Sequence, residues 1–216
     1  MISKPNIIDF QSVKRQPGIG HLLGTEELQK ELLRKSIHMT IAVVPALAQL
    51  VGVNFALALL AAGTMFYTYS EFLRAQGTEI AFIGKMTAAA ARDRDQGKFV
   101  LGPITLGLGA MIALMLYPNP AAAVAIYALA FGDGLSSLAG KLFGTLEIPF
   151  TGGKTLEGST TCLLAVFLST LAVTGLPRES LALAAVAASV ELLPSKDVDN
   201  LILPMVVGAL AVILFV

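Results

Sequence analysis

Two glycine-rich segments of the chain combine acidic, basic and hydroxyl side chains in a pattern suited to phosphate chemistry. The first segment, 131–144, places Asp133 inside an apolar run. An ionised carboxylate is costly there, so Asp133 is a candidate functional residue. On a helix, Asp133 would share one face with small or polar residues, namely Ser136, Ser137, Gly140 and Gly144. Together with Lys154, shortly downstream, this acid predicts a metal and phosphate site at a membrane surface.

The second segment, 152–158, has a lysine directly after two glycines and before the next apolar run. A Walker A loop would need a glycine at the position of Ile148 and a preceding strand, so we exclude that loop. Glycine-freed backbone N–H groups and a lysine before a helix N-terminus still suit a phosphate. The candidate ligands are Gly153, Lys154 and Thr155, while Glu157 could pair with Lys154 or bind Mg²⁺ through oxygen.

A third group of residues shares a helix face where the chain first enters an apolar region. These residues are Glu31, Arg34, Lys35 and His38. The cations could simply anchor the end of a membrane span. Alternatively, Arg34 and Lys35 bind phosphate, and His38 orients the substrate or accepts a proton.

A fourth group is acidic and lies between the last two apolar runs. It consists of Glu191, Asp197, Asp199 and Asn200. One interpretation is a solvated acidic loop; the other is a further site that binds Mg²⁺ or activates a hydroxyl group. Elsewhere, Glu71 and Arg74 lie one helical turn apart and are predicted to form an ion pair.

The composition predicts an all-α integral membrane protein. Of the 216 residues, 55% are hydrophobic and only 14% are charged, against about 25% charged in soluble domains. The formal net charge is zero, which gives no reason to expect a nucleic-acid partner. Residues 1–24 are predicted to be a cytosolic segment and residues 25–216 a single transmembrane catalytic domain. Charge-free runs and their breaks predict seven spans, at about 36–51, 54–73, 99–117, 120–141, 155–175, 179–193 and 200–216.

The distribution of basic residues predicts the orientation of these spans. If the N-terminus is cytoplasmic, 14 of the 15 Lys and Arg residues would lie on the cytoplasmic side, and only Arg178 would lie on the opposite side of the membrane. This asymmetry predicts a cytoplasmic N-terminus and a C-terminus outside. The polar groups described above then share the cytoplasmic face. An interfacial helix is predicted around 78–92.

Taken together, these motifs resemble the family of CTP-dependent lipid-alcohol kinases, which includes dolichol kinase, phytol kinase and yeast-type diacylglycerol kinase. That family is similar in turn to phosphatidate cytidylyltransferases. The matching segments are 31–38, 132–140 with Phe143 and Gly144, 153–158, and 197–200 followed by Pro204. The resemblance implies CTP as phosphoryl donor, a divalent metal, and a long-chain alcohol as acceptor. By position, the functional motifs of the family match Arg34, Lys35, Asp133 and Gly140.

The resulting hypothesis is a multi-pass membrane kinase with its active face in the cytoplasm. It transfers the γ-phosphate of CTP to a polyprenol-type or phytol-type alcohol, or to diacylglycerol. Asp133, with Glu157 or Asp199, would hold Mg²⁺, and His38 or Asp197 would accept the hydroxyl proton. The expected nucleotide ligands are Arg34, Lys35, Gly140, Lys141, Gly153, Lys154, Thr155 and Asn200. A cytidylyltransferase and a membrane transporter are the alternatives. The choice of CTP over ATP and the oligomeric state, a homodimer included, stay open.

Overall fold

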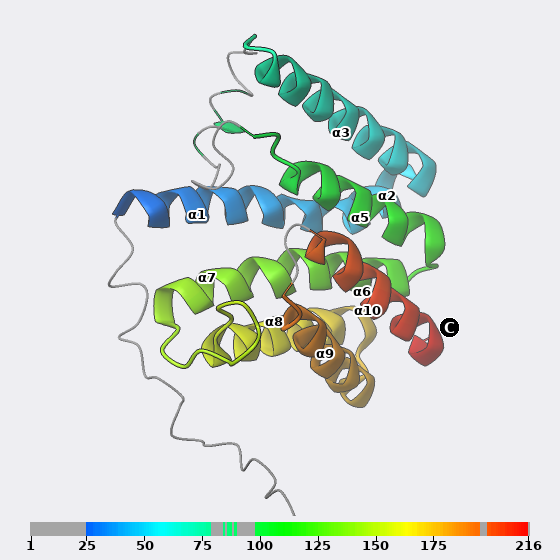
Figure 1. Ribbon diagram of the computed structural model, residues 1–216. Coiled ribbons are helices and arrows are strands. Elements are labelled where there is room, and N and C mark those ends of the chain that lie inside the picture. The colour runs from blue at the N-terminus through cyan, green and yellow to red at the C-terminus, as the bar shows by residue number, and fades with distance from the viewer. Residues whose placement is uncertain are drawn as a thin grey trace, which may run out of the picture.

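The computed structural model describes residues 25–78, 84, 86, 87, 89, 98–194 and 198–215. Within these residues, every regular secondary-structure element is a helix, and the only β pairing is an isolated bridge between Glu147 and Thr155. The all-α prediction is therefore confirmed (Figure 1). The predicted cytosolic segment 1–24 and most of the predicted interfacial helix 78–92 lie outside the described residues.

The first three helical elements follow one another without a break and include one tightened turn. Helix α1, Thr25–Met39, continues through the 3₁₀ turn η3, Thr40–Val43, into α2, Val44–Val51. Pro45, in the first turn of α2, has no N–H to bond to the carbonyl of Ile41, which accounts for the tighter turn. Gly52, with φ of 90°, then reverses the chain into α3, Val53–Ala75.

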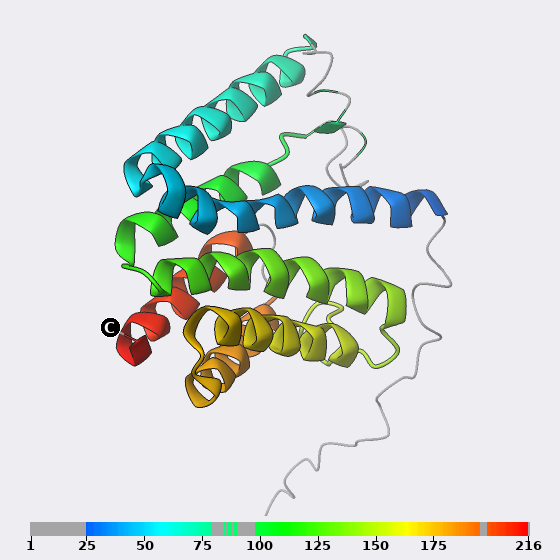
Figure 2. The ribbon, with the colours of Figure 1, turned by 180° about the vertical axis from the view of Figure 1, so that it is seen from behind.

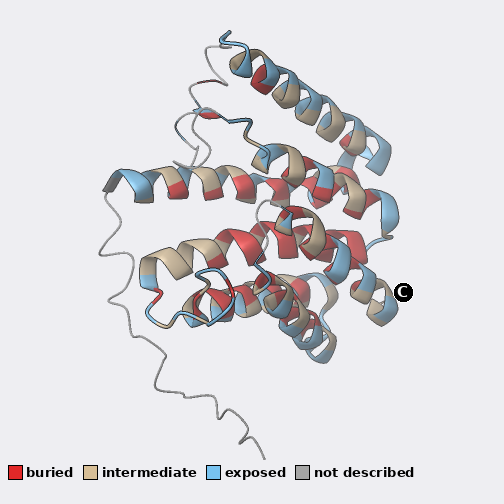
Figure 3. Cartoon of the chain, in the orientation of Figure 1, coloured by how far each residue is buried: buried red, intermediate tan, exposed pale blue. Residues whose placement is uncertain are grey.

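One helix lies at the centre of the molecule. It consists of α6, Ala121–Tyr127, the π-helical segment η5, Ala128–Asp133, and α7, Gly134–Phe143. Figure 3 shows that its first half is almost entirely buried. A π-helical turn inside an α-helix is often found at functional sites, and this one ends at Asp133.

The other helices surround the central helix (Figure 2). They are α5, Gly102–Leu116, α8, Leu156–Thr174, α9, Pro177–Glu191, and α10, Asp199–Phe215. Helices α8 and α9 form a hairpin in which Gly175, at φ of 69°, ends α8 in the left-handed conformation. The seven predicted apolar regions are therefore helical over nearly all of their described lengths.

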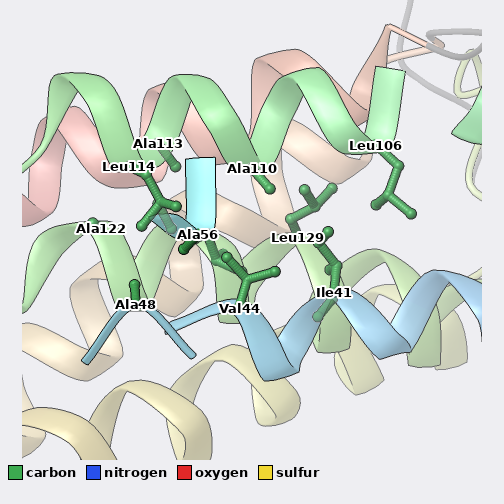
Figure 4. Close-up of a cluster of buried hydrophobic side chains, with 13 residues drawn as sticks. Ile41, Val44, Ala48, Ala56, Leu106, Ala110, Ala113, Leu114, Ala122 and Leu129 are labelled. Atoms are coloured by element: carbon green, nitrogen blue, oxygen red, sulfur yellow. The ribbon is translucent and has the colours of Figure 1, made fainter. Parts of the chain in front are cut away.

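Two apolar clusters hold the central helix from opposite sides. In the first, Leu129 and several central alanines pack against α2, α3 and α5 (Figure 4). In the second, Val124 and Ala128 pack against residues of α8, α9 and α10. The small side chains between 121 and 130 allow close packing on both sides, and this packing fixes the position of Asp133.

Three described helices are long and apolar enough to cross a membrane. They are α3, the central helix Ala121–Phe143, and α8, while α5 and α10 are apolar but shorter. Helix α3 exposes large apolar side chains, including Phe55, Met65, Phe66 and Phe72, as expected for a helix in contact with lipid. These features support a membrane protein. The number of spans and their orientation stay predictions.

Candidate functional site

Most of the predicted site residues line one cavity of about 560 Å³. Its walls include residues of α1, α3, α5 and the segment just before it, the end of η5, α7, α8, the ends of α9 and α10, and the loop between α7 and α8. A volume of this size lies within the range of small-molecule binding sites. The predicted residues that the structure brings together here are Arg34, Lys35, His38, Asp133, Gly140, Lys141, Gly153, Lys154, Thr155, Asp199 and Asn200.

Asp133 is buried and bound by two residues of α1. Lys35 Nζ lies 2.6 Å from Asp133 Oδ2 and 3.1 Å from its backbone oxygen, and the Lys35 side chain is only 2% exposed. His38 Nε2 lies 3.3 Å from the same Oδ2 and 2.9 Å from the carbonyl oxygen of Leu129. A carbonyl oxygen only accepts, so Nε2 carries the hydrogen and the neutral ring keeps Nδ1 as its proton acceptor.

Glu31 joins α1 to α7. Its Oε2 lies 2.6 Å from Lys141 Nζ, and its Oε1 accepts hydrogen bonds from Ser137 Oγ at 2.9 Å and from Arg34. Burial alone would raise the pKa of the Glu31 carboxyl. The positive charge of Arg34 and the hydrogen bond from Lys141 outweigh burial and lower the pKa to about 2.

A third buried carboxylate holds the loop between α7 and α8, which lines the cavity. Lys154 Nζ forms an ion pair with Glu191 Oε1 at the end of α9. Gly152 and Gly153 have φ of 73° and 95°, which side-chain-bearing residues rarely adopt, so glycine is required for this loop. The loop ends at Thr155, whose hydroxyl accepts a bond from the N–H of Gly158 and caps α8.

Gly140 contributes close packing as well as a part of the cavity wall. A Cβ atom at Gly140 would lie 3.0 Å from the hydroxyl oxygen of Thr155, which is too close for an unstrained contact. The absence of a side chain therefore lets α7 approach the capped start of α8. This packing brings Lys141 and Lys154 to the same cavity.

Asn200 and Asp199 lie at the first turn of α10. Asn200 Nδ2 donates to Thr105 Oγ1 at 2.9 Å and to the carbonyl of Gly102 at 3.3 Å, so its amide group connects α10 to α5. Asp199 Oδ1 accepts from the N–H of Asn200. Burial, and next the negative charge of Asp133, raise the pKa of Asp199.

Two predicted site residues do not join this group. Glu157 is not among the cavity residues; its carboxylate accepts bonds from the backbone and hydroxyl of Thr145. The alternative that Glu157 pairs with Lys154 is also not observed, because Lys154 pairs with Glu191. Asp197 lies outside the described residues. The predicted pair of Glu71 and Arg74 is confirmed, with a distance of 2.8 Å between Arg74 Nε and Glu71 Oε2.

The described residues contain no group of three or more His, Cys, Asp or Glu side chains placed to hold a metal ion. A preformed all-protein metal centre is therefore not found in this part of the chain. Mg²⁺ at phosphate-transfer sites is commonly held by one or two carboxylates together with phosphate oxygens of the substrate. The cavity offers Asp133 and Asp199 for such an arrangement, and both contacts of Asp133 with Lys35 and His38 use the same oxygen, Oδ2.

The positive charges of the cavity are already paired with carboxylates. Arg34 and Lys141 pair with Glu31, Lys35 pairs with Asp133, and Lys154 pairs with Glu191. The role of Glu31 and the contact of Glu191 with Lys154 were not predicted from the sequence. The three-residue spacing of Glu31 and Arg34 was a signal for one of these pairs. No sequence signal indicated the pairing of Lys154 with Glu191, which are 37 residues apart.

Comparisons of the chain with protein-family models, with curated proteins and with solved structures found no match. The assignment of a function therefore depends on the chemistry of the cavity itself.

Proposed function

We propose that this protein is a membrane-embedded lipid-alcohol kinase that transfers the γ-phosphate of CTP to a long-chain alcohol. One observation carries this proposal: four cations, a buried histidine and two aspartates line one cavity that also has an apolar wall. Phosphoryl transfer needs mainly positioned charge and an aligned hydroxyl group. The motif resemblance described above adds CTP, rather than another nucleotide, to this proposal.

Lys154 would bind the triphosphate by exchanging Glu191 for phosphate oxygens, whereas Arg34 and Lys141 would bind it while they stay paired with Glu31. Arg34 and Lys141 share the partner Glu31, and Lys154 belongs to the loop between α7 and α8 that lines the cavity. Counting Glu31, the four cations are matched by four carboxylates among the described residues: Glu31, Asp133, Glu191 and Asp199. A cavity so close to neutral would not favour a free triphosphate, so we expect the nucleotide to bind with its Mg²⁺ ion.

His38 is the proposed proton acceptor. Its Nε2 is engaged by the carbonyl of Leu129 and lies beside Asp133, which leaves Nδ1 to accept the proton of the substrate hydroxyl. The hydroxyl oxygen would then bond to the γ-phosphorus as the bond to the β–γ bridging oxygen breaks. Lys154, Arg34 and Lys141 would stabilise the negative charge on the departing CDP.

Bound Mg²⁺ would neutralise phosphate charge during this transfer, and Asp133 and Asp199 are the described carboxylates that would hold it. The acceptor alcohol would lie against the apolar wall of the cavity. The apolar residues that line the cavity include Ile37, Phe99, Leu101, Pro103 and Leu106. Because Ile37 and His38 both line the cavity, we place the hydroxyl end of the alcohol toward His38 and its tail along the apolar residues.

The membrane arrangement belongs to the same proposal. We place the seven apolar regions as spans, the N-terminus and the active cavity at the cytoplasmic side, and the C-terminus outside. The bias of Lys and Arg toward that side supports this orientation. A transporter would need polar groups along a path through the bilayer, whereas the cavity residues belong to the group predicted at one face.

The experiment is a transfer assay on detergent-purified protein with CTP labelled at either the α- or the γ-phosphate. ATP is tested in parallel, and the acceptors are polyprenol, phytol, farnesol, diacylglycerol and phosphatidate. A kinase moves the γ-label into a lipid monophosphate and releases CDP. A cytidylyltransferase acting on phosphatidate moves the α-label into lipid and releases pyrophosphate, which would refute the kinase proposal in favour of that alternative.

Two variants make the assay specific for the cavity. We expect His38→Gln to reduce transfer by about 10²–10⁴-fold, as is typical of a lost general base. Glu71→Gln is the control, because Glu71 is also a buried ionisable residue but does not line the cavity. Equal activity of His38→Gln and the unaltered protein would remove His38 from the mechanism.

A further inference from the structure

Glu31 is a buried carboxylate that does not line the cavity, yet it contacts two cations that do. The residue is 4% exposed, and it accepts hydrogen bonds from Arg34, Ser137 and Lys141. Arg34 belongs to α1, and the other two donors belong to α7, so one carboxylate joins the two helices that carry much of the site.

We propose that Glu31 is a positioning residue for triphosphate binding: it holds Arg34 and Lys141 at the cavity wall and sets the spacing between α1 and α7. This inference rests on the proposed function and deepens it by naming the residue that orders the phosphate ligands. Glu31 touches neither substrate nor reacting atoms; it acts through the two cations.

The geometry explains why such a residue is needed. The Lys141 side chain is 38% exposed and the Arg34 side chain 25% exposed, so neither is immobilised by burial alone. Long side chains lose rotamer freedom when they bind a ligand, and a partner that fixes them beforehand reduces this loss. Lys35 lies one residue after Arg34 in the same helix, and a buried carboxylate nearby also offsets the repulsion among these positive charges.

The partners of Glu31 keep its buried carboxylate ionised. A carboxylate out of water is stable only when hydrogen-bonded and paired, and this one accepts three side-chain donors. Its pKa of about 2 keeps it ionised throughout the physiological range. Replacement by glutamine keeps the shape of the side chain and removes the charge, which makes Glu31→Gln the informative substitution.

The test measures binding of Mg-CTP, Mg-ATP and inorganic triphosphate to the purified full chain by calorimetry, and nucleotide KM and kcat in the transfer assay. We expect Glu31→Gln to weaken binding of all three probes at least tenfold and to raise KM similarly, with kcat changed less than threefold. Glu31→Asp, which restores the charge on a shorter side chain, should recover part of the affinity.

The matched control is Glu71→Gln. Glu71 is 1% exposed and pairs with Arg74 at the same three-residue spacing, but Arg74 does not line the cavity. We expect Glu71→Gln to lower the unfolding temperature without weakening triphosphate binding. If Glu31→Gln cannot be purified folded, Ser137→Ala removes one of the three donors and should weaken binding two- to fivefold.

The outcomes separate the two proposals. Unchanged triphosphate affinity in Glu31→Gln, or in Ser137→Ala where the first variant does not fold, overturns the positioning role and leaves the kinase proposal standing. Equal weakening by Glu31→Gln and Glu71→Gln also overturns it, because the effect would then follow from stability alone. An unaltered protein that binds none of the three probes overturns both proposals.

Discussion

The pair formed by Lys35 and Asp133 gives the sharpest prediction of stability. Lys35 Nζ lies 2.6 Å from Asp133 Oδ2, and the two side chains are 2% and 9% exposed. Asp133→Asn keeps the shape of the side chain but leaves the buried Lys35 ammonium without its counter-ion. Removing one partner of a buried ion pair typically costs about 3–5 kcal/mol. The bond to the backbone oxygen of Asp133, at 3.1 Å, survives, so we expect the lower end, about 3 kcal/mol.

The double variant Lys35→Met with Asp133→Asn tests the origin of this loss. Both charges are then absent, and replacing a buried pair by uncharged groups is often close to neutral. We therefore expect the double variant to recover at least half of the loss, about 1.5 kcal/mol, as a coupling energy between neighbouring sites.

The assay is unfolding of the detergent-purified protein at pH 7, followed by circular dichroism during denaturant titration. Glu71→Gln serves as a control for the loss of a buried charge elsewhere. If the losses caused by Lys35→Met and Asp133→Asn simply add in the double variant, the two charges do not stabilise one another, and the reasoning is refuted. Both Asp133 variants should also lose transfer activity, whatever their stability.

Three further predictions concern pH, packing and metal. The depressed pKa of Glu31 contributes stability that is complete above about pH 4.5 and is lost as the pH falls toward about 2; unfolding curves across this range should show a loss of up to about 3 kcal/mol that Glu31→Gln lacks. Gly109→Ala would place a Cβ atom 2.1 Å from the carbonyl oxygen of Asn200 and should destabilise by about 1–3 kcal/mol. Gly63→Ala, with nothing within 4 Å of the added Cβ atom, should not destabilise the protein. Equal unfolding temperatures for Gly109→Ala and Gly63→Ala would contradict the close packing of Gly109 against Asn200. EDTA should abolish transfer and added Mg²⁺ should restore it; transfer that persists in EDTA would contradict the metal requirement.

The positions of the helices could be predicted closely from the sequence. The predicted spans 54–73 and 155–175 correspond to helices Val53–Ala75 and Leu156–Thr174. The reason is that long charge-free runs bounded by glycine and proline leave few alternatives for the ends of a helix. The sharing of one helix face could also be predicted, because the spacing of Asp133 and Ser136 implies that their side chains lie on the same face.

Contacts between distant helices could not be predicted in the same way. Nothing local indicates that Lys154 pairs with Glu191 rather than with Glu157, which lies only three residues away. The fold decides, because Thr145 binds the Glu157 carboxylate and α9 brings Glu191 to the cavity. The π-helical turn before Asp133 also has no sequence signature here, since its residues, 128–133, would suit an ordinary α-helix.

Pro204 shows how packing resolves a local conflict. Proline inside α10 cannot donate a hydrogen bond to the carbonyl of Asn200, four residues earlier. The structure places Gly109 of α5 against that carbonyl oxygen, where no side chain could fit. The sequence contains both residues, but only the crossing of α5 and α10 shows that they belong together.

The most direct test of the central claim is an experimental structure of the protein with Mg²⁺ and a non-hydrolysable CTP analogue. We predict that the triphosphate lies in the cavity, with phosphate oxygens within about 4 Å of Lys154, Lys141 and Arg34. A nucleotide bound outside the cavity, or one whose phosphates contact none of these cations, would contradict the account.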